Sequence, residues 1–233
     1  MKITYWSDYA CPYCYIGEAR LKKAMETLGI SDKVEIEMKS FELDPNASKK
    51  VLGATTDRFA KKYGLTKEMA AEQIEHISQL GREEGIDFRY ASTLYTNTLD
   101  AHRLTKLAQS KQDGILATKL TELLFDAYFT KNLELSDHQV LTQIAVEAGM
   151  NVEEVKEMLD SDKYETQVRQ DESEASRMGI HGVPFFVVGE KYSLSGAQPE
   201  ETFVLALQKV MEETQDIIEN QGMTCGPNGC HIG

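Results

Sequence analysis

The chain has 233 residues, 41% of them hydrophobic, so it is long enough to bury a core in one or two domains. Its formal net charge of −13 argues against a nucleic-acid-binding surface or attachment to anionic lipid, and we expect neither a nucleic-acid nor a membrane partner. Four cysteines are too few for a disulfide-scaffolded secreted fold. Because no signal-peptide pattern is present and no apolar run approaches ~20 residues, we expect a cytoplasmic protein.

The N-terminal segment predicts a strand followed by a helix. In residues 3–8 successive side chains alternate between the two faces of an extended chain, and the segment is rich in β-branched and aromatic residues, which is typical of a strand. A CPYC sequence follows at 11–14, and apolar residues at helical spacing then continue up to Gly29. Pro12 suits a first helical turn because its missing N–H is not needed there. Cys11 is therefore expected at the N-terminal cap of the helix.

This position gives the two cysteines different chemistry. The free N–H groups and the dipole of a helix N-terminus stabilise an anion, which favours a thiolate at Cys11. Cys14 falls on the same helical face, with its Cβ atom roughly 5–6 Å away, and a disulfide could close after small adjustment. We predict Cys11 as the attacking thiolate and Cys14 as the resolving thiol. Half of a zinc site, or two unreactive buried thiols, are the alternatives.

The middle of the chain predicts one strand and then a long helical region. Residues 33–43 alternate apolar and charged side chains, which indicates a second core strand. From about residue 55 to 178 the pattern is helical, and its clearest stripe consists of Leu116, Leu120, Leu123, Leu124, Ala127 and Tyr128. The breaks between these helices are short, so we expect one packed helical domain over 45–178.

A β-hairpin and a last helix are predicted after this domain. Residues 185–188 form a short apolar run, and 192–195 fit a partner strand across a tight turn. Pro199 then opens an amphipathic helix. Pro184 directly precedes the first of these strands, and because proline cannot donate to a strand ladder it must begin the strand or occupy a special turn.

The C-terminal segment carries the second pair of cysteines. Cys225 and Cys230 are separated by Gly-Pro-Asn-Gly, which predicts a turn in a flexible tail spanning 215–233. A four-residue spacer lets both sulfurs meet, so an auxiliary redox pair that exchanges with CPYC is one hypothesis. A metal site that adds His231 is a second, and unreactive tail thiols are a third.

Most of the sequence resembles proteins with the thioredoxin fold, more specifically the DsbA family and its cytoplasmic FrnE-like branch. The segments that carry the resemblance are DYACPYCYIG, NTLDAHRL, LFDAYFTKNLELSD, GIHGVPFFVV and SGAQP, and they spread over nearly all of residues 1–214. The resemblance implies an α/β fold in which a large all-helical insertion splits a thioredoxin-like core. The expected boundaries are 1–44 and 179–214 for the core, 45–178 for the insertion and 215–233 for the tail.

The same resemblance assigns roles to individual residues. It implies that Pro184 is cis and lies beside Cys11, and that the Val183 backbone pairs with an extended substrate segment. Substrate-binding contacts are accordingly expected from Pro12, Tyr13, Val183 and Pro184. It also suggests polar residues that line the cleft, namely Asn97, His102 and Arg103, while His181, three residues before Pro184, is a candidate for tuning the site because a nearby imidazolium would favour the thiolate. A helix cap and ordinary helix-surface residues are the alternative interpretation of the first three.

We therefore predict a thiol–disulfide oxidoreductase that acts on protein or small-molecule thiols and disulfides. No cofactor or metal is expected beyond its own disulfide, although glutathione could serve as a co-substrate. One alternative is a glutathione-dependent isomerase or transferase resembling 2-hydroxychromene-2-carboxylate isomerase or the kappa-class glutathione transferases. These typically have serine at the position of Cys11 and lack a second thiol, which argues against them. The other alternative is a non-enzymatic redox- or metal-responsive binding protein, and the sequence leaves both a monomer and a homodimer open.

Overall fold

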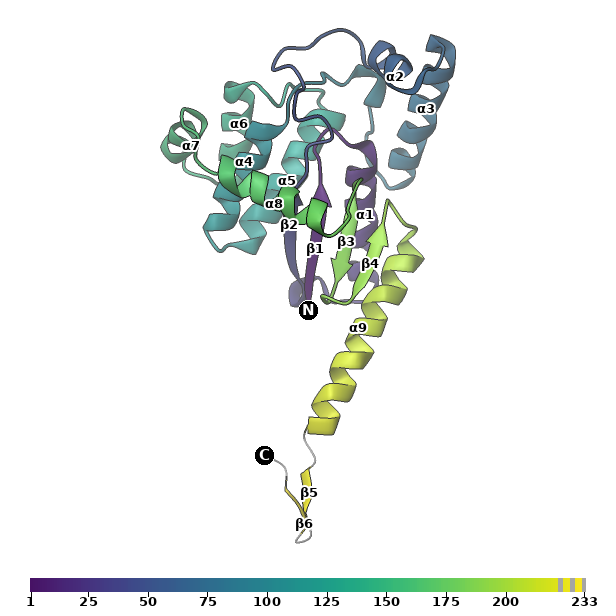
Figure 1. Ribbon diagram of the computed structural model, residues 1–233, viewed down its shortest axis with the longest axis vertical. Helices are drawn as coiled ribbons and strands as arrows, with labels where there is room; N and C mark the ends of the chain where they lie inside the picture. Colours follow the sequence, from purple (N-terminus) through teal and green to yellow (C-terminus); the bar gives the residue numbers. More distant parts are fainter. Residues whose placement is uncertain (222–223, 227–228, 232–233) are drawn as a thin grey trace.

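A four-stranded mixed sheet forms the centre of the molecule in the computed structural model (Figure 1). The structure describes residues 1–221, 224–226 and 229–231, and beyond residue 214 it describes the backbone only. The strand order is β2-β1-β3-β4, with β1 parallel to β2 and the other neighbouring pairs antiparallel. These strands are β1 (Lys2–Ser7), β2 (Glu35–Ser40), β3 (Phe185–Val188) and β4 (Tyr192–Ser195).

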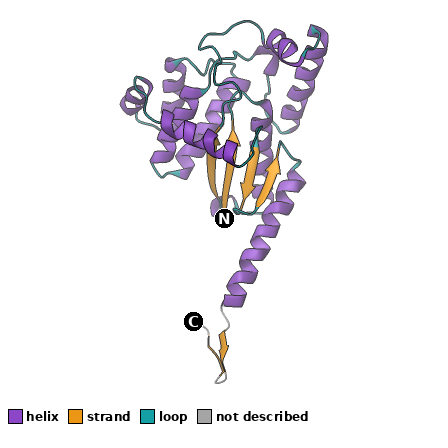
Figure 2. Cartoon of the chain, in the orientation of Figure 1, coloured by secondary structure: helices purple, strands orange, loops and turns teal. Residues whose placement is uncertain are grey.

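Helices cover both faces of this sheet (Figure 2). On one face α1 (Pro12–Thr27) packs against α9 (Glu200–Gln221). The other face is covered by α8 (Glu165–Arg177), and Trp6 of β1 points into this side. The Trp6 indole N–H donates to the backbone oxygen of Asp171, 3.1 Å away, so this buried polar group is satisfied.

The chain between β2 and β3 forms the helical insertion, as the resemblance predicts. Two short 3₁₀ turns lie at Ser31–Lys33, before β2, and at Tyr90–Ser92, inside the insertion. Besides α8, the insertion contains α2 (Thr55–Tyr63), α3 (Lys67–Glu83), α4 (Leu99–Ser110), α5 (Gly114–Phe129), α6 (His138–Ala148) and α7 (Val152–Leu159). Within the described residues, no helix is both long and apolar enough to cross a membrane.

An aromatic cluster fixes the insertion against the helix that carries the CPYC sequence. Tyr15, the residue after Cys14, stacks on Phe125 of α5 with ring centroids 5.1 Å apart. Phe125 also contacts Tyr9, and Phe129 stacks on Phe88 with centroids 4.7 Å apart. Because these buried aromatic contacts join α1 to α5, the insertion holds a defined position over the start of α1.

The last helix is longer than predicted. It continues to Gln221 instead of ending at 214, because neither glycine nor proline interrupts the chain between Pro199 and Gly222. Beyond it, β5 (Thr224–Gly226) pairs antiparallel with β6 (Gly229–His231), and the backbone register sets Cys225 opposite Cys230. The thiol groups of both cysteines lie outside the described side chains.

Candidate functional site

Cys11 occupies the N-terminal cap of α1. Its backbone is extended, with φ −92° and ψ 115°, and Pro12 begins the helix. No side chain caps this end and no acidic residue lies in the first turn. The positive end of the helix dipole is therefore not neutralised by a local side chain, and it acts on the Cys11 sulfur.

Both cysteines of the pair are buried, but their surroundings differ. Cys11, which is 4% exposed, lines a pocket, whereas Cys14 is fully buried and does not line it. Burial raises the pKa of the Cys14 thiol well above its usual value, and the adjacent Cys11 raises it further. No disulfide joins the pair in this structure. Cys11 is therefore placed to react first, while Cys14 is held as a neutral thiol.

The loop before β3 lies directly against Cys11. The Val183–Pro184 peptide bond is cis, and the Val183 backbone oxygen is 3.5 Å from the Cys11 sulfur. Close packing holds this loop on α1, because a Cβ atom at Gly17 would stand only 3.2 Å from both the Pro184 and Phe186 side chains. Because Gly17 has no side chain, α1 and the loop before β3 can pack closely although they are far apart in the sequence.

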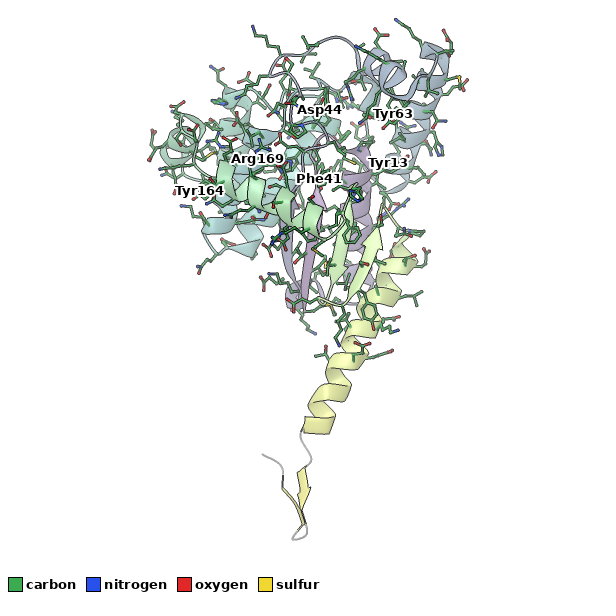
Figure 3. The ribbon with its side chains drawn as sticks, viewed as in Figure 1. Tyr13, Phe41, Asp44, Tyr63, Tyr164 and Arg169 are labelled. Carbon is green, nitrogen blue, oxygen red and sulfur yellow. The ribbon has the colours of Figure 1, made fainter. Side chains whose placement is uncertain are left out.

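A pocket of about 450 Å³ opens beside Cys11, between the core and the insertion. Three of its lining residues, Tyr13, Leu43 and Tyr63, are exposed apolar side chains, and Figure 3 shows both tyrosines on the same side of the molecule. The remaining lining residues are Ala10, Cys11, Pro12, Arg58, Phe59, Lys62, Leu65, Gln73, Ile77, Tyr90, Tyr95, Gly182 and Val183. The pocket therefore presents a reactive sulfur, backbone edges and aromatic surface together.

Two of the polar residues expected in the cleft lie behind the site and do not line this pocket. Asn97 donates to the Glu42 carboxylate at 3.2 Å and accepts from the Leu99 N–H at 2.9 Å. Arg103 binds Asp100 at 2.6 Å and donates to backbone oxygens of the last turn of α7 and of the segment that follows it. Both side chains make structural hydrogen bonds within and beside the insertion, and neither lines the cleft as the sequence predicts.

Neither expected histidine lines the pocket. His102 is fully buried, and its ring packs 5.0 Å from that of Tyr9. Neither of its ring nitrogens has a hydrogen-bond partner within the described residues, although Nε2 lies 3.5 Å from the Asp8 carboxylate. His181 is exposed on the loop that leads to Gly182. Of the predicted site residues, the structure therefore brings Pro12, Tyr13 and Val183 to Cys11, with Pro184 in the same loop.

Asp8 was not anticipated from the sequence. It is buried at the end of β1, three residues before Cys11. Its carboxylate accepts hydrogen bonds from the Ala10 N–H at 3.2 Å, the Leu43 N–H at 2.8 Å and the Thr98 hydroxyl at 2.8 Å. Asp8 thus ties the loop that leads to Cys11 to the segment after β2 and to the start of α4. Its position shortly before the CPYC sequence is the only signal that could have indicated it.

Glu18 lies one helical turn after Cys14, against β1. It accepts a hydrogen bond from the buried Tyr5 hydroxyl at 3.1 Å. Burial, with a smaller contribution from the charge of Glu122, raises the pKa of Glu18 to about 8, although the hydrogen bond from Tyr5 opposes the rise. At neutral pH the folded protein therefore retains a proton on Glu18 that the unfolded chain releases.

This proton makes the stability of the protein depend on pH. The stabilising contribution is complete below about pH 4.5 and is lost as the pH rises through about 8. Relative to Glu18→Gln, we expect the wild-type free energy of unfolding to fall by ~1–3 kcal/mol between about pH 6 and pH 9. Urea unfolding of the reduced proteins at both pH values measures this, with the exposed Glu26→Gln on the same helix as control. Equal changes in the wild type and Glu18→Gln would contradict the assignment.

Comparisons with known proteins agree with this geometry. The chain is 33% identical to a probable DsbA oxidoreductase from Streptomyces coelicolor, with a TM-score of 0.84 and coverage of 100% of this chain and 99% of that one. It is 25% identical to the uncharacterized protein YwbO of Bacillus subtilis, over 88% of this chain and 94% of YwbO. A 2-hydroxychromene-2-carboxylate isomerase structure shares the fold, with 12% identity, a TM-score of 0.68 and coverage of 93% and 99%. A model of the DSBA-like thioredoxin domain matches residues 2–208, and the chain therefore belongs to this family.

Proposed function

We propose that the protein is a thiol–disulfide oxidoreductase that acts through the Cys11–Cys14 dithiol. The Cys11 thiolate attacks one sulfur of a substrate disulfide, the substrate S–S bond breaks, and its electron pair leaves with the released thiolate. The Cys14 thiol loses its proton and attacks the Cys11 sulfur, which releases the second substrate thiolate. Cys11 and Cys14 are then joined in a disulfide, and an external thiol must return two electrons before the next cycle.

One observation carries this proposal. Cys11 sits at an uncapped helix N-terminus, lines the pocket and faces the Val183 backbone oxygen, whereas Cys14 is enclosed beneath it. This arrangement supports attack by the first thiol and resolution by the second. The Val183–Pro184 segment and the Pro12-Tyr13 turn flank the reacting sulfur, and we assign to them the contacts with an extended substrate.

Reduction of the substrate disulfide uses only the protein's own thiols, and an external thiol is needed only to restore the Cys11–Cys14 dithiol. We propose no metal or organic cofactor, with glutathione as a co-substrate able to reduce the Cys11–Cys14 disulfide. The proposed compartment is the cytoplasm, where thiols are mostly kept reduced and the dithiol would be the resting form. In that state the favoured direction is reduction or isomerisation of substrate disulfides.

For the tail we propose an auxiliary redox pair. Backbone pairing of β5 with β6 sets Cys225 opposite Cys230, which supports the idea that the two residues can form a disulfide. Such a pair would exchange electrons with the Cys11–Cys14 pair by the same chemistry. Metal binding by the two tail cysteines and His231 is the competing assignment.

Reduction of insulin disulfides, driven by dithiothreitol, tests the proposal. We expect the wild type to accelerate the reaction and Cys11→Ser to lower kcat/KM by ~10³-fold or more, because the nucleophile is lost. The Cys225→Ser/Cys230→Ser double variant should retain the basal reaction and lose only transfer involving the tail. Wild-type activity no higher than that of Cys11→Ser would refute the function. Glutathione-dependent isomerisation of an aromatic substrate that survives Cys14→Ser would favour the isomerase instead.

A further inference from the structure

The pocket beside Cys11 is positively charged, although the protein as a whole is acidic. Its two charged lining residues are Arg58 and Lys62, which lie one turn apart on α2, and among the described residues no carboxylate lines it. The chain contains 38 acidic and 25 basic residues, so a pocket whose charged lining residues are both cations runs against the composition of the protein. These two residues come from the insertion, whereas Cys11 comes from the core.

Arg58 lacks the acidic partner that five of the other six arginines of this protein have. Within the described part of the chain, no carboxylate lies within ion-pair distance of Arg58, and its buried Nε atom donates to no acceptor. Its guanidinium carbon lies 3.8 Å from the centre of the Tyr95 ring. By contrast, carboxylates pair with Arg20, Arg82, Arg89, Arg103 and Arg169.

The surroundings of Arg58 hold the guanidinium without neutralising it. A cation over an aromatic face is stabilised by the ring quadrupole and keeps its N–H groups available. The Tyr95 hydroxyl donates to Asp44 at 3.4 Å, so this acidic neighbour contacts the tyrosine and does not reach Arg58. The planar guanidinium presents paired donors that match a carboxylate, and an ion pair in a partly enclosed pocket is screened less than one in open solvent.

We propose that Arg58, assisted by Lys62, forms a carboxylate-binding subsite, and that the preferred substrates are disulfides carrying a carboxylate near the reacting sulfur. The proposal rests on the thiol–disulfide function given above. Arg58 takes no part in electron transfer, because its role is to bind the anionic group while Cys11 attacks the disulfide. Its effect therefore falls on KM more than on kcat. The carboxylate can belong to a small disulfide or to an acidic residue beside a cystine in a peptide.

Single-turnover oxidation of the reduced enzyme tests this inference in the Cys225→Ser/Cys230→Ser background. Three small disulfides serve as probes: anionic 3,3′-dithiodipropionate, neutral 2-hydroxyethyl disulfide and cationic cystamine. Each rate constant is divided by that for attack of 2-mercaptoethanol on the same disulfide, which removes intrinsic reactivity. We expect the corrected preference for the anionic over the neutral disulfide to be ~10-fold or more, and to decrease with added salt.

Variants of Arg58 and one matched control separate the subsite from general charge effects. Arg58→Gln should reduce the anionic preference by ~10-fold, and Arg58→Lys, which keeps the charge but not the paired donors, should give an intermediate value. Lys209→Gln removes the same charge from a cation that also lies over a tyrosine, Tyr192, outside the pocket, and should leave the preference unchanged. A matched pair of peptide disulfides, with glutamate or glutamine beside the cystine, shows whether the carboxylate source is a peptide or a small molecule.

The outcomes distinguish this inference from the function on which it rests. Reaction with all three disulfides at equal corrected rates, or a preference unchanged in Arg58→Gln, would overturn the subsite and leave the oxidoreductase intact. An equal loss in Lys209→Gln would also overturn it, because the effect would then come from net charge. If no disulfide oxidised the wild type faster than Cys11→Ser, both the function and the subsite would be refuted.

Discussion

Replacing Cys14 by serine is expected to stop turnover while leaving the first chemical step intact. Cys14 is fully buried beneath Cys11, and burial keeps its thiol protonated in the resting enzyme. Cys11, which lines the pocket, can therefore still attack a substrate disulfide in Cys14→Ser, but Cys14 is no longer present to release the product. In the dithiothreitol-driven insulin assay we expect turnover to fall by ~10²-fold or more, and without added thiol we expect a covalent enzyme–substrate complex to accumulate.

Cys11→Ser provides the matched control, because it removes one sulfur of the same pair. In the Cys225→Ser/Cys230→Ser background it should lose turnover and form no complex at all, since the thiol that then remains, Cys14, is enclosed. Non-reducing electrophoresis after incubation with oxidised insulin distinguishes the two variants. A complex that forms equally in both, or in Cys11→Ser alone, would reverse the assignment of the two thiols.

Asp8→Ala is expected to destabilise the protein more than any other substitution named above. The carboxylate is the shared acceptor for the N–H groups of Ala10 and Leu43 and for the Thr98 hydroxyl. Alanine leaves these donors without a partner in a buried environment, at a cost of ~3–5 kcal/mol in the free energy of unfolding. Because the same bonds fix the loop before Cys11, we also expect a lower kcat/KM for disulfide reduction.

The same change at an exposed position controls for the loss of an aspartate as such. Asp137 caps α6 by accepting from the Gln139 N–H, so Asp137→Ala should cost only ~1 kcal/mol and leave disulfide reduction unchanged. Urea unfolding at constant pH compares the two variants, and Asp8→Asn, which keeps an oxygen acceptor, should fall between them. If Asp8→Ala lowered the free energy of unfolding no more than Asp137→Ala does, the buried hydrogen bonds of Asp8 would not stabilise the fold as we expect.

Local sequence patterns predicted the elements of the core well. Proline after Cys11 and the apolar spacing behind it placed the start of α1, and the apolar run after Pro184 placed β3. The alternating pattern predicts a second strand over 33–43, but β2 begins at Glu35 and ends at Ser40. The predicted residues after Ser40 leave the sheet and form tertiary hydrogen bonds instead, for example from the Leu43 N–H to Asp8. The alternation of apolar and polar residues does not reveal such hydrogen bonds.

The pocket could not be predicted in the same way, since most of it depends on how the insertion packs. Arg58 and Lys62 belong to an ordinary amphipathic helix in the sequence, and only tertiary packing brings α2 to Cys11. Conversely, the sequence suggests Arg103 as a cleft residue, but its guanidinium donates to backbone oxygens at the end of α7 and in the segment that follows it. A charged residue on a helix has the same local pattern whether it faces a substrate or a loop, so burial and partners decide its role.

Peptide mapping of the complex trapped by Cys14→Ser, with the tail cysteines intact, tests the central claim most directly. The claim is that Cys11 is the thiol that attacks the substrate, and that Cys14 resolves the product. Digestion without reductant, followed by mass spectrometry, identifies which cysteine carries the substrate sulfur. The account predicts the substrate on Cys11. A substrate sulfur on Cys225 or Cys230, with Cys11 still a free thiol, would contradict it.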